Sequence, residues 1–476
     1  MPWLLRVRVA DRHTRFVSAA IPALLREPDR SARLLSYVGN VPLRSRSVRS
    51  VVTIATMYIP VFLFVLLVFS GVTWSLADSQ VVADAGGDTA IGVFSGKLGL
   101  VTGLALVGVY LPALRNPLRS LGGALCLFWL LALASVLWAS NVGTVLFAVA
   151  NLTLLLAATM LAHRLLGFAR ALRLVWWLST ALILLSVVFA AVGEAHAVMG
   201  GMHGGRWRGL FAHKNSFGPF LVVNLLIALF AQASLKLPAV LVFAMVAVDL
   251  VALFFANSAT ADIAAAAGII AGIALLPIPN RAVRTLWRGG SVVVACLLGG
   301  VLLMQPAVTG ELLGRDTTMS GRAAMWEQAL PLTVERPFGT GYGTGGGSQV
   351  SIELQKRMHR AINLSVQSGY LNLALELGWG AVALFLLWAG GAAAWVLFSR
   401  RASSAQTLLA ALLAAMLVES ISEVNACFAP GWLLLVTMLP MIDARRAMRP
   451  RWRLLRRRYR RSVSGAVTSP VPVRGE

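Results

Sequence analysis

The sequence predicts an all-α, polytopic integral membrane protein with about twelve transmembrane helices and one long extracytoplasmic loop. The 476 residues are 58% hydrophobic and only 13% charged, a balance too apolar for a soluble protein of this length. The apolar residues stand in uninterrupted runs of about 20, the length at which a helix crosses a bilayer. The runs do not alternate with polar residues, which disfavours a barrel of membrane strands.

The charge distribution supports the same prediction. The formal net charge is +23, and the basic residues fall in short blocks between the apolar runs and at both ends of the chain. Nucleic-acid binding is one explanation of so basic a chain, but lysine and arginine are retained on the cytoplasmic side of membrane loops, which we favour. We therefore expect a basic cytoplasmic segment at 1–50, a transmembrane domain at 51–443 and a basic cytoplasmic tail at 444–476. No cleavable signal precedes the first apolar run, so that run is expected to act as an uncleaved anchor in the cytoplasmic membrane.

The apolar runs and the basic blocks between them place each expected helix in turn. The expected spans are 51–76, 93–114, 121–138, 144–161, 174–198, 219–235, 237–256, 263–279, 291–308, 371–398, 407–418 and 429–442. Each return to the cytoplasm is followed by basic residues, as the charge rule requires. This parity puts the polar stretch 205–218 and the long loop 309–370 on the outer face.

The three cysteines, Cys126, Cys296 and Cys427, show neither a disulfide framework nor a metal-ligand spacing, so no metal site is expected. Arginines on the outer face run against the charge rule. Arg206 and Arg208 lie in the first outer stretch, and Arg322 lies in the long loop. A guanidinium matches phosphate geometry, so a phosphate or diphosphate is the expected ligand. Binding of lipid headgroups, or pairing with glutamates of the same loop, is the alternative.

The motifs in these two outer segments resemble the O-antigen ligase/polymerase superfamily, and its exopolysaccharide-production polymerases in particular. They are Arg206-Trp207-Arg208-Gly209-Leu210-Phe211-Ala212-His213-Lys214-Asn215, Gly314-Arg315-Asp316, Ser320-Gly321-Arg322 with Trp326, Arg336-Pro337-Phe338-Gly339-Thr340-Gly341-Tyr342-Gly343, and Ser368-Gly369-Tyr370-Leu371. The resemblance extends over roughly 93–440.

This resemblance implies a metal-independent, GT-C-like membrane glycosyltransferase that needs no cofactor. Its donor would be a glycan on a polyprenyl diphosphate, and its acceptor another lipid-linked glycan or a lipid. Arg206 and Arg322 are then expected to hold the diphosphate, with Arg208 as a substitute for Arg206. The implied substrate-binding residues are Arg208, His213, Lys214, Asn215, Arg315, Trp326, Arg336 and Tyr370. Membrane lipids and other polysaccharide assembly or export proteins are the further expected partners, and nucleic acid is not expected.

Two departures from the family's pattern affect the acceptor. Gln367 stands where the family has a histidine that is thought to assist the acceptor hydroxyl. Glutamine cannot act as a base at neutral pH, so His359 is the other candidate, and an ordinary loop histidine is the alternative for it. In Ser258-Ala259-Thr260, alanine replaces the family's arginine.

Several other polar features carry weaker expectations. Glu194, Glu376 and Glu423 fall near outer helix ends and could line the site, whereas Asp249 has no predicted role. The glycine run at 340–348 is expected to be mobile. A transporter and a catalytically silent scaffold in polysaccharide export remain the alternative functions.

Overall fold

A computed structural model of the chain describes its central part. The described residues are 123–150, 152–153, 168–194, 197–200, 204–211, 213–232, 236–276, 278, 280, 282–291, 322–344, 349–358, 366–398 and 402–423. Within these ranges all regular elements are helices, and the β pairing is limited to an isolated bridge between Val198 and Trp207. The all-α prediction is confirmed for this part. Several expected features lie outside the described residues. They are the spans at 51–76, 93–114 and 429–442, nearly all of the span at 291–308, both basic ends, Arg315 and His359.

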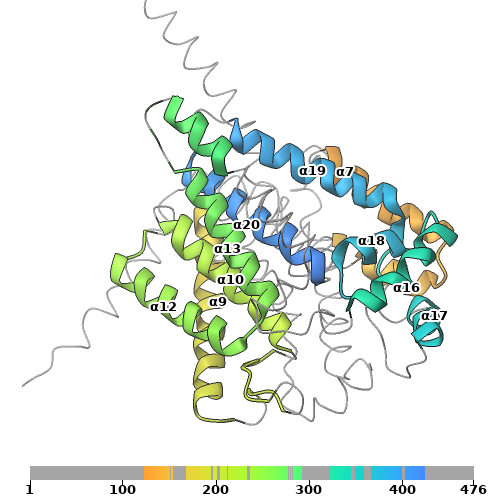
Figure 1. Ribbon diagram of the computed structural model, residues 1–476, viewed down its shortest axis with the longest axis horizontal. Helices are drawn as coiled ribbons and strands as arrows, with labels where there is room; N and C mark the ends of the chain where they lie inside the picture. Colours follow the sequence, from red (N-terminus) through yellow and green to blue (C-terminus); the bar gives the residue numbers. More distant parts are fainter. Residues whose placement is uncertain are drawn as a thin grey trace, which may run out of the picture.

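The helices follow the apolar runs in order along the chain (Figure 1). Their bounds are α7 Gly123–Ala134, η2 Ser135–Leu137, α9 Phe168–Ala191, α10 Lys214–Phe230, α12 Ala239–Ala256, α13 Ala259–Ala274, α16 Arg322–Glu335, α17 Gln349–Met358, α18 Gly369–Leu377, α19 Trp379–Leu397 and α20 Ser404–Ser422. Four described segments are long and apolar enough to cross a membrane: Leu172–Ala191 of α9, and α12, α19 and α20. At about 1.5 Å per residue, such helices match the hydrocarbon thickness of a bilayer.

Small residues allow the central helices to approach one another closely. The sequence of α13 is rich in alanine and glycine, and this helix packs against α10 and α20. Helices inside a membrane associate through such small faces, because lipid offers no hydrophobic drive between them. Gly218 marks the contact of α10 with α13, since a Cβ there would lie 2.6 Å from the Cβ of Ala261. These contacts bring the first turns of α10 and α13 together.

A buried polar network ties α10 to its neighbours α9 and α12. Asn224 of α10 donates from Nδ2 to both carboxylate oxygens of Asp249 of α12, at 3.0 and 3.3 Å. The hydroxyl of Thr180 in α9 donates to Oδ1 of Asn224 at 3.4 Å. All three side chains are buried, as expected for polar groups that face protein rather than lipid. Asp249, which had no predicted role, therefore joins helices within the bundle.

Several expected helix bounds differ from the structure, three of them for evident local reasons. The helix expected at 219–235 begins at Lys214, since Pro219 is accommodated near its start. The helix expected at 174–198 ends at Ala191. The single span expected at 371–398 is two helices, because Gly378 adopts φ 80° and ψ 169° between α18 and α19.

The long outer loop is partly folded. Its described part contains α16 and α17, which pack with α18 around a separate small core of Ala329, Leu332, Val350, Leu354, Val366, Leu371 and Leu375. In the glycine run that is expected to be mobile, the described residues 340–344 are hydrogen-bonded to the end of α18. The N–H groups of Thr340 and Gly341 donate to the carbonyls of Leu375 and Glu376, both at 2.9 Å. The N–H of Gly343 donates to Oε2 of the buried Glu376 at 2.9 Å.

Replacing Gly378 by alanine is expected to destabilise this junction. Its backbone angles suit glycine alone, which costs another residue about 1–3 kcal/mol, and the added Cβ would lie 2.0 Å from the carbonyl oxygen of Pro337. Thermal unfolding of the purified protein measures the loss. Gly380→Ala is the matched control, since a Cβ at that helical position meets nothing within 4 Å. Equal unfolding temperatures for the two variants would contradict the prediction.

Candidate functional site

The motif around His213 forms the start of α10. The His213 backbone is extended, and its Nδ1 accepts a hydrogen bond from the N–H of Asn215 at 3.1 Å, so the imidazole caps the helix. Lys214 is buried, and its Nζ donates to the carbonyl of Asn257 at 2.6 Å. Asn257 is the C-cap of α12 and has a left-handed backbone with φ 46°. Lys214 therefore joins the start of α10 to the end of α12, where a cation is favoured by the exposed carbonyls.

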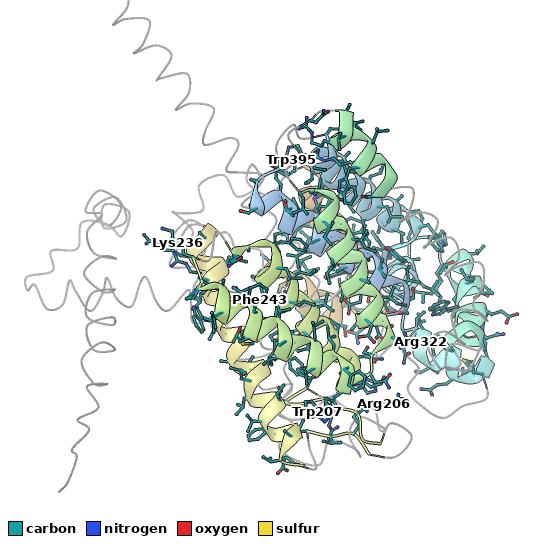
Figure 2. All side chains as sticks on the ribbon, turned by 60° about the vertical axis from the view of Figure 1, so that its left-hand side comes forward. Arg206, Trp207, Lys236, Phe243, Arg322 and Trp395 are labelled. Carbon is teal, nitrogen blue, oxygen red and sulfur yellow. The ribbon has the colours of Figure 1, made fainter. Side chains whose placement is uncertain are left out.

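The arginine-rich stretch that precedes α10 folds back on itself. The N–H of Met199 donates to the carbonyl of Arg206 at 2.8 Å, and the N–H of Arg208 donates to the carbonyl of Ala197 at 2.9 Å. Trp207 stacks on Phe255 at the end of α12, with ring centroids 4.4 Å apart. Arg208 is only 5% exposed, and desolvation lowers the pKa of its guanidinium, whereas Arg206 is partly exposed. Figure 2 shows Arg206 beside Trp207, at the other end of α12 from Lys236.

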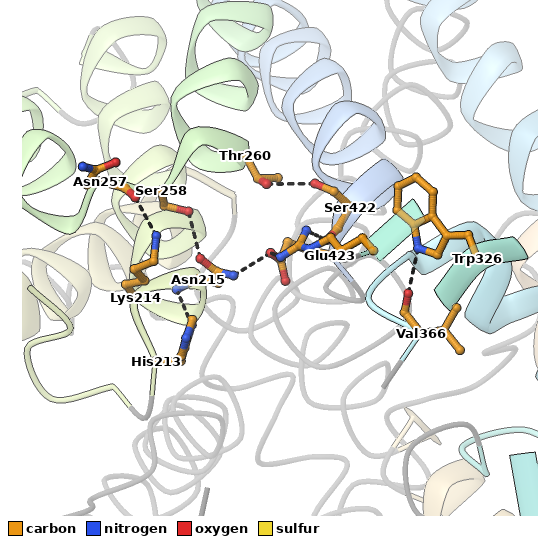
Figure 3. Close-up of polar contacts among 11 residues, drawn as sticks. His213, Lys214, Asn215, Asn257, Ser258, Thr260, Trp326, Val366, Ser422 and Glu423 are labelled. Carbon is orange, nitrogen blue, oxygen red and sulfur yellow. Dashed lines mark hydrogen bonds and ion pairs between the residues drawn. The ribbon is translucent and has the colours of Figure 1, made fainter. Parts of the chain in front are cut away.

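Four helices meet at the C-terminal end of α20 in a connected polar group, which we call the Glu423 cluster. It consists of Asn215, Ser258, Thr260, Arg322, Ser422 and Glu423 (Figure 3). Asn215 of α10 donates from Nδ2 to Oε1 of Glu423 at 2.8 Å and accepts at Oδ1 from the hydroxyl of Ser258 at 3.3 Å. The hydroxyls of Thr260 and Ser422 form a hydrogen bond of 2.8 Å. The first turns of α10 and α13 are thus joined to the last turn of α20.

Arg322, the first residue of α16, completes this cluster. Its Nη2 donates to Oε1 of Glu423 at 2.7 Å, and its Nη1 donates to the carbonyl of Ser422. Both charged side chains are 12% exposed, so the ion pair is largely withdrawn from solvent yet still accessible. Glu423 therefore binds Arg322 and Asn215 through the same carboxylate oxygen. A pair in this setting keeps the guanidinium oriented while leaving a charged group that an anion can approach.

Helix dipoles add positive potential to the same place. Three helices, α10, α13 and α16, contact Ser422 or Glu423 with their N-terminal ends. The contacts are made by Asn215, Thr260 and Arg322, respectively. The N-terminus of α18 is also adjacent, because a Cβ on its first residue, Gly369, would lie 3.2 Å from the Glu423 carbonyl oxygen. N-termini of helices carry partial positive charge and free N–H donors, which suit an anionic group. These N-termini and Arg322 favour an anionic group, whereas the C-terminus of α20 and the Glu423 carboxylate carry the opposite charge.

Two other predicted residues, Trp326 and Tyr370, lie on helices around this cluster, and Gln367 lies just before one of them. Trp326 of α16 donates from Nε1 to the carbonyl of Val366 at 2.9 Å, and Tyr370 of α18 donates from its hydroxyl to the carbonyl of Leu417 at 2.8 Å. Gln367 has a left-handed backbone, with φ 46°, directly before the N-cap of α18. Such a backbone in a residue other than glycine is uncommon and is found more often at functional sites. The structure thus places Gln367 two residues from Gly369, which borders the cluster.

Arg336 is not part of the Glu423 cluster. It directly follows α16, at the opposite end of that helix from Arg322. Its carbonyl accepts from the N–H of Gly339 at 2.8 Å in the turn that follows. Across the described residues, no three His, Cys, Asp or Glu side chains are close enough together to hold a metal ion.

Glu423, Ser258 and Thr260 contribute more contacts to the site than the sequence predicts. Glu423 was recognised only as a carboxylate near an outer helix end, and its contacts to Asn215 and Arg322 span 208 and 101 residues of the chain. No local pattern encodes such distant pairs. The Ser-x-Thr element of the family pointed to Ser258 and Thr260. Both residues lie in the cluster, although Ala259 replaces the arginine at the centre of that element.

Comparison with known proteins identifies a related family for part of the chain. Residues 240–386 match the family model described as O-antigen ligase. The match runs from the start of α12 into α19 and includes Ser258, Thr260, Arg322, Gln367 and Tyr370. No curated protein and no solved structure matches the chain. This match supports, for residues 240–386, the resemblance of the chain to the O-antigen ligase/polymerase superfamily.

Proposed function

We propose that the protein is a membrane glycosyltransferase that transfers a glycan from a polyprenyl diphosphate to an acceptor glycan or lipid. The observation that carries this proposal is the Glu423 cluster, in which Arg322 and several helix N-termini surround one carboxylate. The site thus offers both anion-binding groups and one group that can accept a proton. A family domain of the O-antigen ligase type supports lipid-linked glycan as the substrate class.

The proposed site faces away from the cytoplasm. Lys236 precedes α12, whereas the cluster is at the other end of that helix, beyond Ala256. Arg288 donates from Nη1 to the carbonyl of Leu397, at the end of α19 remote from α18. Basic residues therefore gather at the ends of these helices opposite the cluster, and such ends are retained in the cytoplasm. By this rule the cluster lies on the outer face of the cytoplasmic membrane, with both chain termini inside.

In the proposed reaction, negative charge develops on the leaving diphosphate. An acceptor hydroxyl oxygen attacks the anomeric carbon of the donor glycan, and the bond from that carbon to the diphosphate oxygen breaks. The electron pair leaves with the polyprenyl diphosphate, where Arg322 and the nearby helix N-termini stabilise the developing negative charge. Preorganised donors of this kind are effective because they need no reorganisation during the reaction. Arg206, on the neighbouring stretch, is the second diphosphate ligand in this proposal, and the deeply buried Arg208 contributes less.

Glu423 is the proposed acceptor of the proton. In the structure, its Oε1 is engaged by Arg322 and Asn215, at 2.7 and 2.8 Å. A diphosphate that binds Arg322 competes with this contact and leaves the carboxylate available to the acceptor hydroxyl. Glu423 thereby supplies the base that Gln367 cannot supply. Gln367 and Tyr370 remain proposed contacts to the acceptor, and Trp326 to the substrate glycan.

The lipid-linked species that accumulates without the protein tests this function. A deletion strain is expected to lose polymer and to build up single lipid-linked repeat units, and the wild-type gene on a plasmid should restore the polymer. Loss of a ligase would instead leave finished polymer attached to its lipid carrier. Finished polymer that has been released from the carrier but is not delivered would favour a transporter or an export scaffold, and an unchanged glycan profile would reject the proposal.

A further inference from the structure

An apolar stripe is exposed along the C-terminal half of α16. Leu330 and Val334, four residues apart on one face of the helix, are 47% and 78% exposed, and Phe338 in the turn that follows is 70% exposed. The opposite face of the helix is buried, because Ala329 and Leu332 belong to the core shared with α17 and α18. The stripe is therefore not a consequence of loose packing. It is the outward face of a well-packed helix.

The stripe is continuous with the ends of two apolar helices. Trp138, which follows η2, donates from Nε1 to the carbonyl of Phe338 at 2.8 Å, and the two rings are 6.2 Å apart. Trp379, the first residue of the membrane-spanning α19, donates from Nε1 to the hydroxyl of Thr333 in α16 at 3.0 Å. Leu137 beside Trp138 is 86% exposed. Figure 1 shows α16 at the end where α7 and α19 lie next to each other.

The composition of this surface matches the boundary of a bilayer. Tryptophan is enriched where acyl chains meet headgroups, because its ring is apolar and its N–H can form a hydrogen bond. The carboxylate of Glu335, which follows Val334 in the chain, is directed to α17, where it pairs with Arg357 at 3.0 Å. This ion pair raises the pKa of the Arg357 guanidinium, mainly through its hydrogen bond with Glu335. Glu335 is thus turned away from the stripe, whereas the exposed Glu327, three residues before Leu330, lies on the same face and limits the stripe to the C-terminal half of α16.

We propose that Leu330, Val334 and Phe338 dip into the outer leaflet of the bilayer, so that α16 is a membrane-surface helix. The partner of this surface is the acyl region of the surrounding phospholipid. The argument for lipid is the continuity of the stripe with α19, which is long and apolar enough to cross a membrane and whose Leu387 is itself 74% exposed. The contact fixes the depth of α16 at the bilayer surface, and Arg322 is at the N-terminal end of the same helix. It does not depend on which reaction the protein performs.

Photo-crosslinking tests the contact without changing the native cysteines. A benzophenone amino acid replaces Phe338, and the purified protein is irradiated in liposomes of defined phospholipid that contain no polyprenyl lipid. We expect a covalent phospholipid adduct, detected by mass spectrometry, as for the same probe at Leu387. The probe at Ala324, which is exposed on α16 outside the stripe, is expected to give little adduct. The proposal would be overturned if the Leu387 variant gave a phospholipid adduct and the Phe338 variant, under the same conditions, gave none.

The two other possible occupants give different products. A crosslinked dimer of the chain would assign the stripe to a second copy, and an adduct that forms only after polyprenyl diphosphate is added would assign it to the donor's chain. Either result would overturn the assignment to phospholipid.

An independent measurement uses a fluorophore attached to the introduced thiol of a Val334→Cys variant, in a background without Cys126, Cys296 and Cys427. Its fluorescence is expected to be strongly quenched by lipids that carry a spin label near the headgroup. A fluorophore introduced in the same way through Ala324→Cys should be quenched much less. Equal quenching at the two positions would also overturn the proposal.

Discussion

Transfer activity is expected to fall about a hundredfold to a thousandfold when Arg322 is replaced by alanine, the usual effect of removing one preorganised donor from a developing anion. The guanidinium contacts Glu423 and the carbonyl of Ser422 at the start of α16, where the diphosphate is proposed to bind. The measurement is the initial rate of transfer from a purified lipid-linked donor in liposomes. Membrane insertion and the unfolding temperature are measured on the same samples.

Two further variants separate the role of geometry from that of charge. Arg322→Lys keeps the charge but loses the planar pair of donors, so most of the activity should still be lost. Arg357→Ala is the matched control, since this arginine pairs with Glu335 and Glu353 on α16 and α17 at the surface, away from the cluster. It is expected to retain activity. Normal transfer by Arg322→Ala in well-folded protein would remove Arg322 from the proposed mechanism.

Replacing Glu423 by glutamine is expected to lower the turnover rate by about a hundredfold to ten-thousandfold, the range for losing a positioned general base. The amide is nearly the same size as the carboxylate, and its oxygen can still accept from Asn215 and Arg322, but it cannot take up the acceptor's proton. The loss should therefore appear in kcat at saturating acceptor, with a smaller change in KM for the donor. Steady-state kinetics with varied donor and acceptor measure both.

The alternative role for Glu423 predicts a different pattern. If the carboxylate only orients Arg322, the Gln variant should mainly raise KM for the donor and leave kcat close to wild type. Glu335→Gln serves as the matched control, because it removes an exposed carboxylate of α16 that pairs with Arg357 rather than with the cluster. Its kinetics are expected to resemble those of the wild type. A Glu423→Gln variant with wild-type kcat would refute the assignment of the base.

Much of the fold could be predicted because apolar runs long enough to cross a bilayer leave few alternatives to helices. The α12 helix lies within one residue or two of its expected span, since its run is apolar apart from Asp249 and ends at Asn257. Bounds were wrong where a local feature competes with hydropathy. His213 caps α10 ahead of Pro219, and Gly378 breaks a continuous apolar run into α18 and α19. The helical content of the long loop was missed because its small core forms only when α16, α17 and α18 pack together.

For the site, the sequence by itself identified Arg322, Lys214 and Asn215 as members of motifs, and it placed a diphosphate as the expected ligand. It could not show that Lys214 is used to join α10 to α12, because its partner is a backbone carbonyl 43 residues away. Only the tertiary structure assembled Asn215, Arg322 and Glu423 into one cluster. Hydropathy and motif spacing act along the chain, whereas such a cluster depends on helix packing, which brings together side chains separated by 100 residues or more.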